Sequence, residues 1–139
     1  MGNKKPLNFQ LTDFPFHHET QTRWKDMDSF GHVNNANYLT FIEDARITLF
    51  KRWKLNEKNK SLIVASIKID YLNQLKHPCE MIIGQRISRI GNKSFDIESV
   101  IFNKKNHSPL AFSLVVCVCY DYENSLSAPV FQEIIADYN

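Results

Sequence analysis

The longest helical pattern of apolar side chains runs from Ala36 to Trp53, a stretch without Gly or Pro. At roughly 100° per residue these side chains gather on an arc of about 180°, wider than the stripe of a helix that lies on a surface. Polar residues remain on the other side, and they are Thr40, Asp44, Thr48 and Lys51. The pattern therefore predicts a mostly enclosed helix, about 27 Å long at the α-helical rise of about 1.5 Å per residue.

A first strand is expected before this helix, and four segments after it alternate apolar and polar side chains as β-strands do. The five segments span residues 16–24, 62–72, 81–90, 94–103 and 110–120. The segment 110–120 is the most apolar, so we expect it in the centre of the sheet. Short turns with Pro78, Gly91 and Pro109 connect the last four segments, which predicts an antiparallel meander.

The segment from Leu62 to Leu72 has the clearest alternation. Its odd positions form one apolar face, and they are Ile63, Ala65, Ile67, Ile69 and Tyr71. The order of strand, long helix and four strands predicts an α+β fold in which one sheet curls around one helix. Residues 1–15 are expected to be a polar lead-in, and residues 16–139 a single domain.

Composition indicates an ordinary globular protein. The chain has 139 residues, 43% hydrophobic and 12% aromatic side chains, and a net charge of +2, which makes nucleic-acid binding by bulk charge improbable. No apolar segment is long enough for a membrane span or a signal peptide. Cys79, Cys117 and Cys119 lack C-x-x-C spacing, so we expect no metal site or disulfide and a cytoplasmic location.

The stretch KDMDSFGHVNNANYL, residues 25–39, carries the candidate chemistry. Asn34 or Asn35 suits the N-cap of the helix, where unpaired N–H groups and the helix dipole stabilise negative charge on a carbonyl oxygen. Gly31 leaves room for a substrate, and an upstream aspartate could activate water or attack the carbonyl itself. The alternative is purely local, because Asp, Asn and His are also common in turns and caps.

A resemblance to a known family adds to this interpretation. The stretch RWKDMDSFGHVNNANYL and the following FIEDAR resemble the signature of 4-hydroxybenzoyl-CoA thioesterase-like and acyl-ACP thioesterase-like members of the hotdog-fold superfamily. The segments IKIDYLNQL and RIGNKSF are similar to later strands of that family. The resemblance implies a five- or six-stranded antiparallel sheet wrapped around one long central helix. It also implies a homodimer or homotetramer that hydrolyses acyl-CoA or acyl-carrier-protein thioesters without a metal or organic cofactor.

Carried over by position, the resemblance makes Asp28 the catalytic carboxylate and Asp26 its structural partner. His32 matches an assisting histidine of the acyl-ACP branch, whereas Phe30 stands where that branch has Asn, which puts an amide-assisted mechanism in doubt. His32 could therefore orient water, bind the carbonyl or cap the turn. The N–H near Asn35 matches the donor that polarises the carbonyl.

The carrier end of the substrate is expected at the turn from Arg89 to Ser94. Arg89 and Lys93, with Ser94 beside them, could bind phosphates of CoA or phosphopantetheine, although these charges could equally be ordinary solvated residues at a hairpin. On the helix, Glu43 and Arg46 are expected to satisfy each other as an i, i+3 pair.

Two other functions compete with hydrolysis. A dehydratase would pair His32 with Glu43, but the chain lacks the His-Phe-Pro-Gly-type motif of such enzymes. A hotdog protein could also bind an acyl thioester without converting it.

Overall fold

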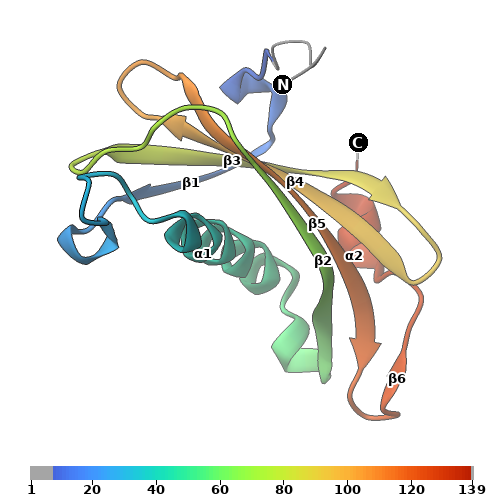
Figure 1. Cartoon of the computed structure of the whole chain (residues 1–139). Helices are drawn as coiled ribbons and strands as arrows, with labels where there is room; N and C mark the ends of the chain where they lie inside the picture. The colour runs from blue at the N-terminus through green and yellow to red at the C-terminus, as the bar shows by residue number, and fades with distance from the viewer. Residues whose placement is uncertain (1–7, 139) are drawn as a thin grey trace.

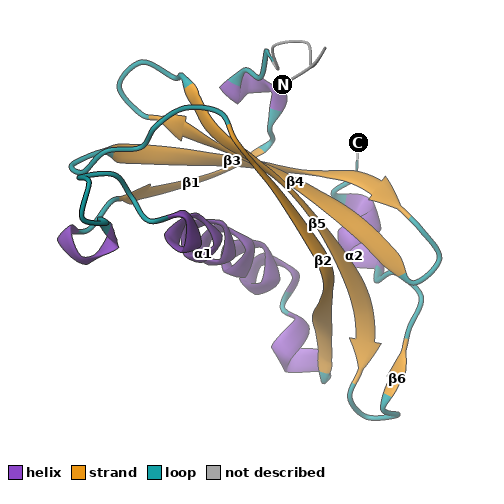
Figure 2. Ribbon diagram, in the orientation of Figure 1, coloured by secondary structure: helices purple, strands orange, loops and turns teal. Residues whose placement is uncertain are grey.

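The computed structural model describes residues 8–138 and contains one curled antiparallel sheet with a long helix in its concave face (Figures 1 and 2). The strands are β1 (Phe16–Gln21), β2 (Lys60–Tyr71), β3 (Glu80–Ile90), β4 (Ser94–Asn103), β5 (Pro109–Asp121) and the short β6 (Leu126–Ser127). The helices are α1 (Asn35–Trp53) and the short α2 (Gln132–Ala136). This is the α+β hotdog arrangement that the sequence predicts.

The strand order corrects the predicted meander. The sheet runs β1-β3-β4-β5-β2, with β6 paired to β5. Only β3, β4 and β5 follow one another as a meander, because β2 pairs with β5 rather than with β3. The most apolar strand, β5, lies between β4 and β2, so β4 rather than β5 is the central one of the five long strands.

The predicted apolar face of β2 is correct from Ile67 to Tyr71 and wrong before it, at Ile63. A β-bulge between Val64 and Ser66 adds one residue at Ala65, so Val64 shares a face with Ile67 and Tyr71, while Ile63 points the other way. A bulge shifts the two-residue alternation by one position. The helix covers β2 only in part, because the side chains of Ile67 and Tyr71 are 44% and 49% exposed.

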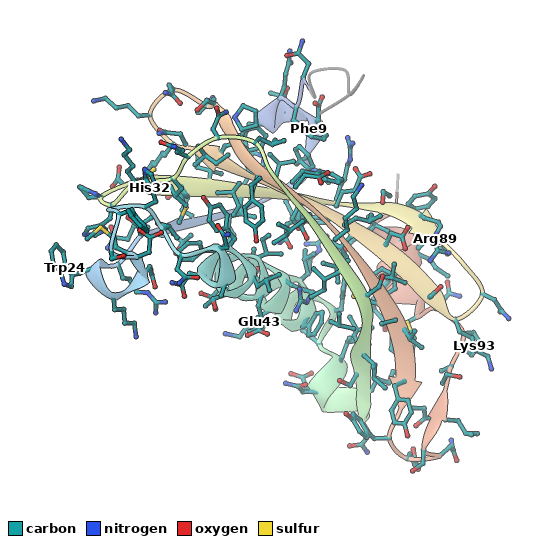
Figure 3. The ribbon with its side chains drawn as sticks, in the orientation of Figure 1. Phe9, Trp24, His32, Glu43, Arg89 and Lys93 are labelled. Atoms are coloured by element: carbon teal, nitrogen blue, oxygen red, sulfur yellow. The ribbon has the colours of Figure 1, made fainter. Side chains whose placement is uncertain are left out.

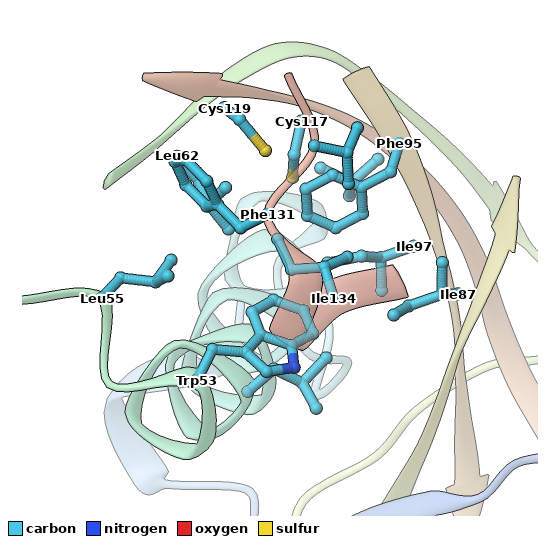
Figure 4. Close-up of a cluster of buried hydrophobic side chains, with 13 residues drawn as sticks. Trp53, Leu55, Leu62, Ile87, Phe95, Ile97, Cys117, Cys119, Phe131 and Ile134 are labelled. Carbon is cyan, nitrogen blue, oxygen red and sulfur yellow. The ribbon is translucent and has the colours of Figure 1, made fainter. Parts of the chain in front are cut away.

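The core between sheet and helix consists of two apolar clusters. One lies around the first half of α1, with Tyr38, Phe41 and Ile42 against β3 to β5. The other lies around the second half, where Trp53 meets β4, β5 and α2 (Figure 4). In that second cluster Cys117 and Cys119 are buried free thiols.

The N-terminal segment covers part of the convex face. Phe14 is buried against Val100 and Phe102 on the outer side of the sheet, and it lies where a Cβ on Gly84 would approach to 2.9 Å. The predicted lead-in therefore contributes packing from its last residues, while residues 1–7 lie outside the described range. No helix within residues 8–138 is both long and apolar enough to cross a membrane.

Candidate active site

Asp26 anchors the loop between β1 and α1 through hydrogen bonds. It closes the 3-10 turn Trp24–Asp26, is 1% exposed, and accepts hydrogen bonds from Arg23 Nε at 3.0 Å and Arg23 Nη2 at 2.7 Å. These bonds lower the pKa of the Asp26 carboxyl from its usual value, against the opposing effect of burial. The Asp26 carbonyl accepts from the backbone N–H of Asn34 at 2.8 Å and from Asn37 Nδ2 at 3.0 Å. Asp26 thus links the loop to the start of the helix.

The two carboxylate oxygens of Asp28 differ in their contacts within the described part of the chain. Its Oδ1 accepts from the N–H groups of Phe30 at 2.8 Å and His32 at 3.1 Å, and its own N–H donates to the His32 carbonyl at 2.7 Å. Its Oδ2 accepts no hydrogen bond from residues 8–138. The turn therefore orients the carboxylate through Oδ1 and leaves Oδ2 without a partner among residues 8–138.

The backbone conformation at position 31 favours glycine. Its φ of +81° lies in the left-handed region that side chains disfavour. A Cβ at this position would meet nothing within 4 Å, so the turn conformation rather than a crowded neighbour requires glycine. Gly31 is not among the residues that line the pocket beside Asp28, and its expected role in substrate binding stays a prediction.

The first turn of α1 has one unpartnered donor. Asn34 is the N-cap, and its Oδ1 accepts from the Ala36 N–H at 3.0 Å while its carbonyl accepts from the Asn37 N–H at 2.9 Å. The N–H of Asn35, the first helical residue, donates to none of residues 8–138. Within the described chain it is therefore an unpaired donor at the positive end of a 19-residue helix.

A pocket of about 440 Å³ brings these groups together. Its wall is formed by Asp28, His32, Val33, Asn35, Tyr38, Tyr71, Leu72, Asn73, Gln74 and Leu75. Tyr71 from the end of β2 closes one side, because its hydroxyl donates to the Asn35 carbonyl at 3.3 Å and its ring meets Tyr38 edge-on at 4.9 Å. The residues from 71 to 75 were not predicted as part of the site, since they lie 36 or more positions after Asn35.

A larger cavity, about 510 Å³, lies around Thr22, His77 and Cys79 at the start of β3. Asp28 and Asn35 do not line it, so we place the candidate chemistry in the smaller pocket despite the difference in volume. Among residues 8–138 no three His, Cys, Asp or Glu side chains gather as a metal site would require.

Other predicted site residues lie elsewhere. Arg89 and Lys93 lie at the opposite end of the molecule from His32 (Figure 3), and Arg89 donates to Ser94 Oγ and Asp96 Oδ1, both at 2.9 Å. Glu43 lies on the outer flank of α1 and is absent from the pocket wall, so the structure does not bring it together with His32 as a dehydratase would need.

Known proteins with similar sequences and structures include thioesterases. The profile of the thioesterase-like superfamily matches residues 22–137. The uncharacterized protein YsmA of Bacillus subtilis is 33% identical over 94 residues, which are 66% of this chain and 64% of YsmA. The long-chain acyl-CoA thioesterase FadM of Escherichia coli is 27% identical over 108 residues, 74% of this chain and 81% of FadM. This chain thus spans just under two thirds of YsmA.

A solved thioesterase from Thermus thermophilus, complexed with coenzyme A and Zn, superposes with a TM-score of 0.76 at 31% identity, covering 89% of this chain and 97% of that one. The superfamily match contains the whole loop from Arg23 to Asn34, the helix α1 that follows it, and the long strands β2 to β5. The chain therefore belongs to the thioesterase-like superfamily.

Proposed function

We propose that the protein hydrolyses an acyl-CoA or acyl-carrier-protein thioester to a free acid and a thiol. The observation that carries the proposal is that Asp28, with a free carboxylate oxygen, and Asn35, with a free N–H, line the same pocket. Hydrolysis needs a base or nucleophile and a donor for the carbonyl oxygen, and these two groups meet that need. The family and the activity of FadM support the same reaction class.

In the proposed reaction the thioester carbonyl accepts a hydrogen bond from the Asn35 N–H. Asp28 Oδ2 takes a proton from water as the water oxygen bonds to the carbonyl carbon, and the developing negative charge lies at the start of α1. The C–S bond then breaks, and the proton held by Asp28 passes to the departing sulfur. The alternative route has Asp28 attack the carbon directly and uses the same free oxygen.

His32 has a less direct part in this proposal. Its N–H and carbonyl hold Asp28 in the turn, through the bonds at 3.1 Å and 2.7 Å, and it lines the same pocket. Its backbone therefore orients the carboxylate, and its ring borders the space where water and the thioester would meet.

Assembly is part of the proposal, because the expected phosphate site is incomplete within one chain. Arg89 and Lys93 lie at the opposite end of the molecule from His32 of the pocket (Figure 3), and Ser94 accepts a hydrogen bond from Arg89, so these residues would reach the pocket rim only from a second copy. The 12-residue strand β2 is at one end of the sheet order and pairs with β5 alone among the described strands. Long edge strands with apolar side chains favour pairing with another chain, which supports a homodimer formed through β2.

Hydrolysis of a panel of acyl-CoA and acyl-carrier-protein thioesters, followed by thiol release, tests the proposal. We expect turnover of at least one member and no hydration of an enoyl-CoA. Binding of the same thioesters without thiol release would contradict the proposal and favour a hotdog binding protein.

A further inference from the structure

The loop between β1 and α1 exposes two large aromatic side chains. Phe30 is 84% exposed and Trp24 is 77% exposed, which makes them the most exposed large apolar side chains among residues 8–138. Trp24 points away from the body of the molecule, at the end that carries His32 (Figure 3). Single exposed apolar residues are ordinary on protein surfaces, so the question is whether these two belong to one surface.

Contacts with the segment before β3 place both rings at the same end of the molecule. Phe30 is two residues before His32, and His32 forms a β-bridge with Lys76. The next residue, His77, meets the ring of Trp24 edge-on, with 6.3 Å between the ring centroids. Both rings are therefore close to the bridge between His32 and Lys76.

The exposed charges beside these rings are positive. Lys25 and Lys76 are exposed, and neither forms a salt bridge with any of residues 8–138. Of the two carboxylates in the loop, Asp26 is 1% exposed and paired with Arg23, and Asp28 is half-buried in the pocket wall. We call this surface of two aromatic rings and two cations the aromatic tip, and its residues are Trp24, Lys25, Phe30 and Lys76.

A second pair of exposed apolar side chains offers a comparison. Tyr122 and Leu126 are 60% and 63% exposed on the hairpin between β5 and β6, at the other end of the molecule (Figure 1). The charged residues next to Tyr122 along the chain are acidic, Asp121 and Glu123. The hairpin thus shares the apolar exposure of the aromatic tip but has carboxylates where the tip has ammonium groups.

We propose that the aromatic tip docks the protein on an anionic lipid bilayer. The rings of Trp24 and Phe30 enter the headgroup region, and the ammonium groups of Lys25 and Lys76 lie against lipid phosphates. Aromatic rings favour the boundary between water and hydrocarbon, and a negatively charged leaflet attracts nearby lysines. Two rings and two charges bury little area, so the attachment is peripheral and reversible.

Docking would also bring the pocket close to the bilayer, because Asp28 and His32 of the pocket wall belong to the same loop. Long acyl chains partition into bilayers, so a thioester dissolved there would lie near the candidate chemistry. The docking itself goes beyond the proposed hydrolysis and is measured without turnover.

Sedimentation of the full chain with vesicles tests the proposal, with phosphatidylcholine alone compared with a mixture of phosphatidylcholine and phosphatidylglycerol. We expect binding to the mixed vesicles at low salt, and weaker binding as salt screens the lysines. Trp53 is 2% exposed and already buried, so a blue shift of tryptophan emission on docking would come from Trp24. Trp24→Phe should keep vesicle binding and lose this shift.

Paired variants separate the apolar and the charged contributions. Trp24→Ser combined with Phe30→Ser should weaken binding to the mixed vesicles by about tenfold or more, because the ring area buried in the interface is lost. Lys25→Gln combined with Lys76→Gln should weaken it by about fivefold per lysine and leave binding to phosphatidylcholine alone unchanged.

The matched control is Tyr122→Ser combined with Leu126→Ser, which removes a similarly exposed apolar pair from the acidic hairpin. Binding to the mixed vesicles should change by less than about twofold in this control. All of the replaced side chains are exposed, so the unfolding temperatures of these variants should stay close to that of the wild type.

Four results would overturn the proposal and leave the proposed hydrolysis intact. One is a wild type that does not sediment with the mixed vesicles at low salt. Another is unchanged vesicle binding by the variant with Trp24→Ser and Phe30→Ser. A lower mass of that variant in light scattering would instead assign the rings to a contact between two copies. Binding of an acidic carrier protein through the rings, without vesicle binding, would assign them to a protein partner. Conversely, vesicle docking without turnover of any thioester would overturn the proposed hydrolysis and leave the docking in place.

Discussion

Replacement of Asp28 by Asn separates the chemistry of this residue from its role in the turn. The Oδ1 of asparagine can still accept from the N–H groups of Phe30 and His32, and the new amide nitrogen replaces Oδ2, which has no partner within residues 8–138. Bonds to a charged acceptor contribute about 1.5–3 kcal/mol and neutral ones about 0.5–1.5 kcal/mol. Asp28 is only half-buried, so solvent reduces this difference, and we expect a loss of folding stability of about 1 kcal/mol or less.

The catalytic loss should be much larger than this loss of stability. Removal of a positioned base lowers rates by about 10²–10⁴, which corresponds to roughly 3–5 kcal/mol of transition-state stabilisation. We therefore expect kcat of Asp28→Asn to fall by about 10²–10⁴ while KM stays within a few fold, since the carbonyl donor at Asn35 and the pocket wall are retained.

The assay is thiol release at saturating concentrations of the best thioester, with thermal unfolding of each variant measured in parallel. Asp26→Asn is the matched control, because it makes the same chemical change at a carboxylate that holds the loop rather than at the free one. It should lower the unfolding temperature more than Asp28→Asn does and kcat less. A folded Asp28→Asn protein with near wild-type kcat would refute the mechanism, and His32 would then be the next residue to replace.

Three further predictions concern stability and assembly. The folded pKa of Asp26 is lowered, chiefly by its hydrogen bonds from Arg23, so its stabilisation is complete above the unfolded value of 3.8 and is lost as pH falls through the lower folded value. The difference in unfolding temperature between wild type and Asp26→Asn should therefore be largest at neutral pH and shrink below about pH 4; a difference independent of pH would contradict this origin. Gly31→Ala should cost about 1–2 kcal/mol in urea unfolding, from backbone strain alone, because open space surrounds the site; an unchanged midpoint would show that the turn adapts without cost. Light scattering should give at least twice the 16.3 kDa chain mass, and Ile63→Lys on the edge strand should shift the protein toward 16.3 kDa. A wild type of 16.3 kDa at micromolar concentration would rule out the dimer.

Much of the fold could be predicted from short windows of the chain. The run from Ala36 to Trp53 has helical periodicity without Gly or Pro, and α1 begins one residue earlier, after Asn34, which is one of the two predicted caps. The segment 94–103 matches β4 at both ends, because alternation and a tight turn act over a few residues. The different roles expected for Asp26 and Asp28 followed from the family resemblance. The hydrogen bonds that Asp26 accepts from Arg23 agree with its expected structural role.

Prediction from short windows failed where a single inserted residue changes which face of a strand a side chain lies on, and where an element is very short. The bulge at Ala65 moves Ile63 to the opposite face from Ile67, although both fit the odd-numbered alternation. The five residues of α2, Gln132–Ala136, are too few for a periodic pattern and depend on packing against Trp53. Such features have no strong local preference, and contacts with distant residues determine them.

The partners of the polar groups were decided by tertiary structure alone. Sequence placed Asn35 at the start of a helix, where an unpaired N–H is expected, but only the packed chain shows which distant residues line the pocket beside it. Sequence likewise placed Arg46 within an apolar arc, whereas the packed chain leaves its guanidinium without a hydrogen bond among residues 8–138. Likewise, β2 pairs with β5 and thereby places Tyr71 against the start of α1. Local propensity determines which segments become helix or strand, whereas pairing, burial and the remaining free donors depend on which distant segments meet, because those contacts compete across the whole chain.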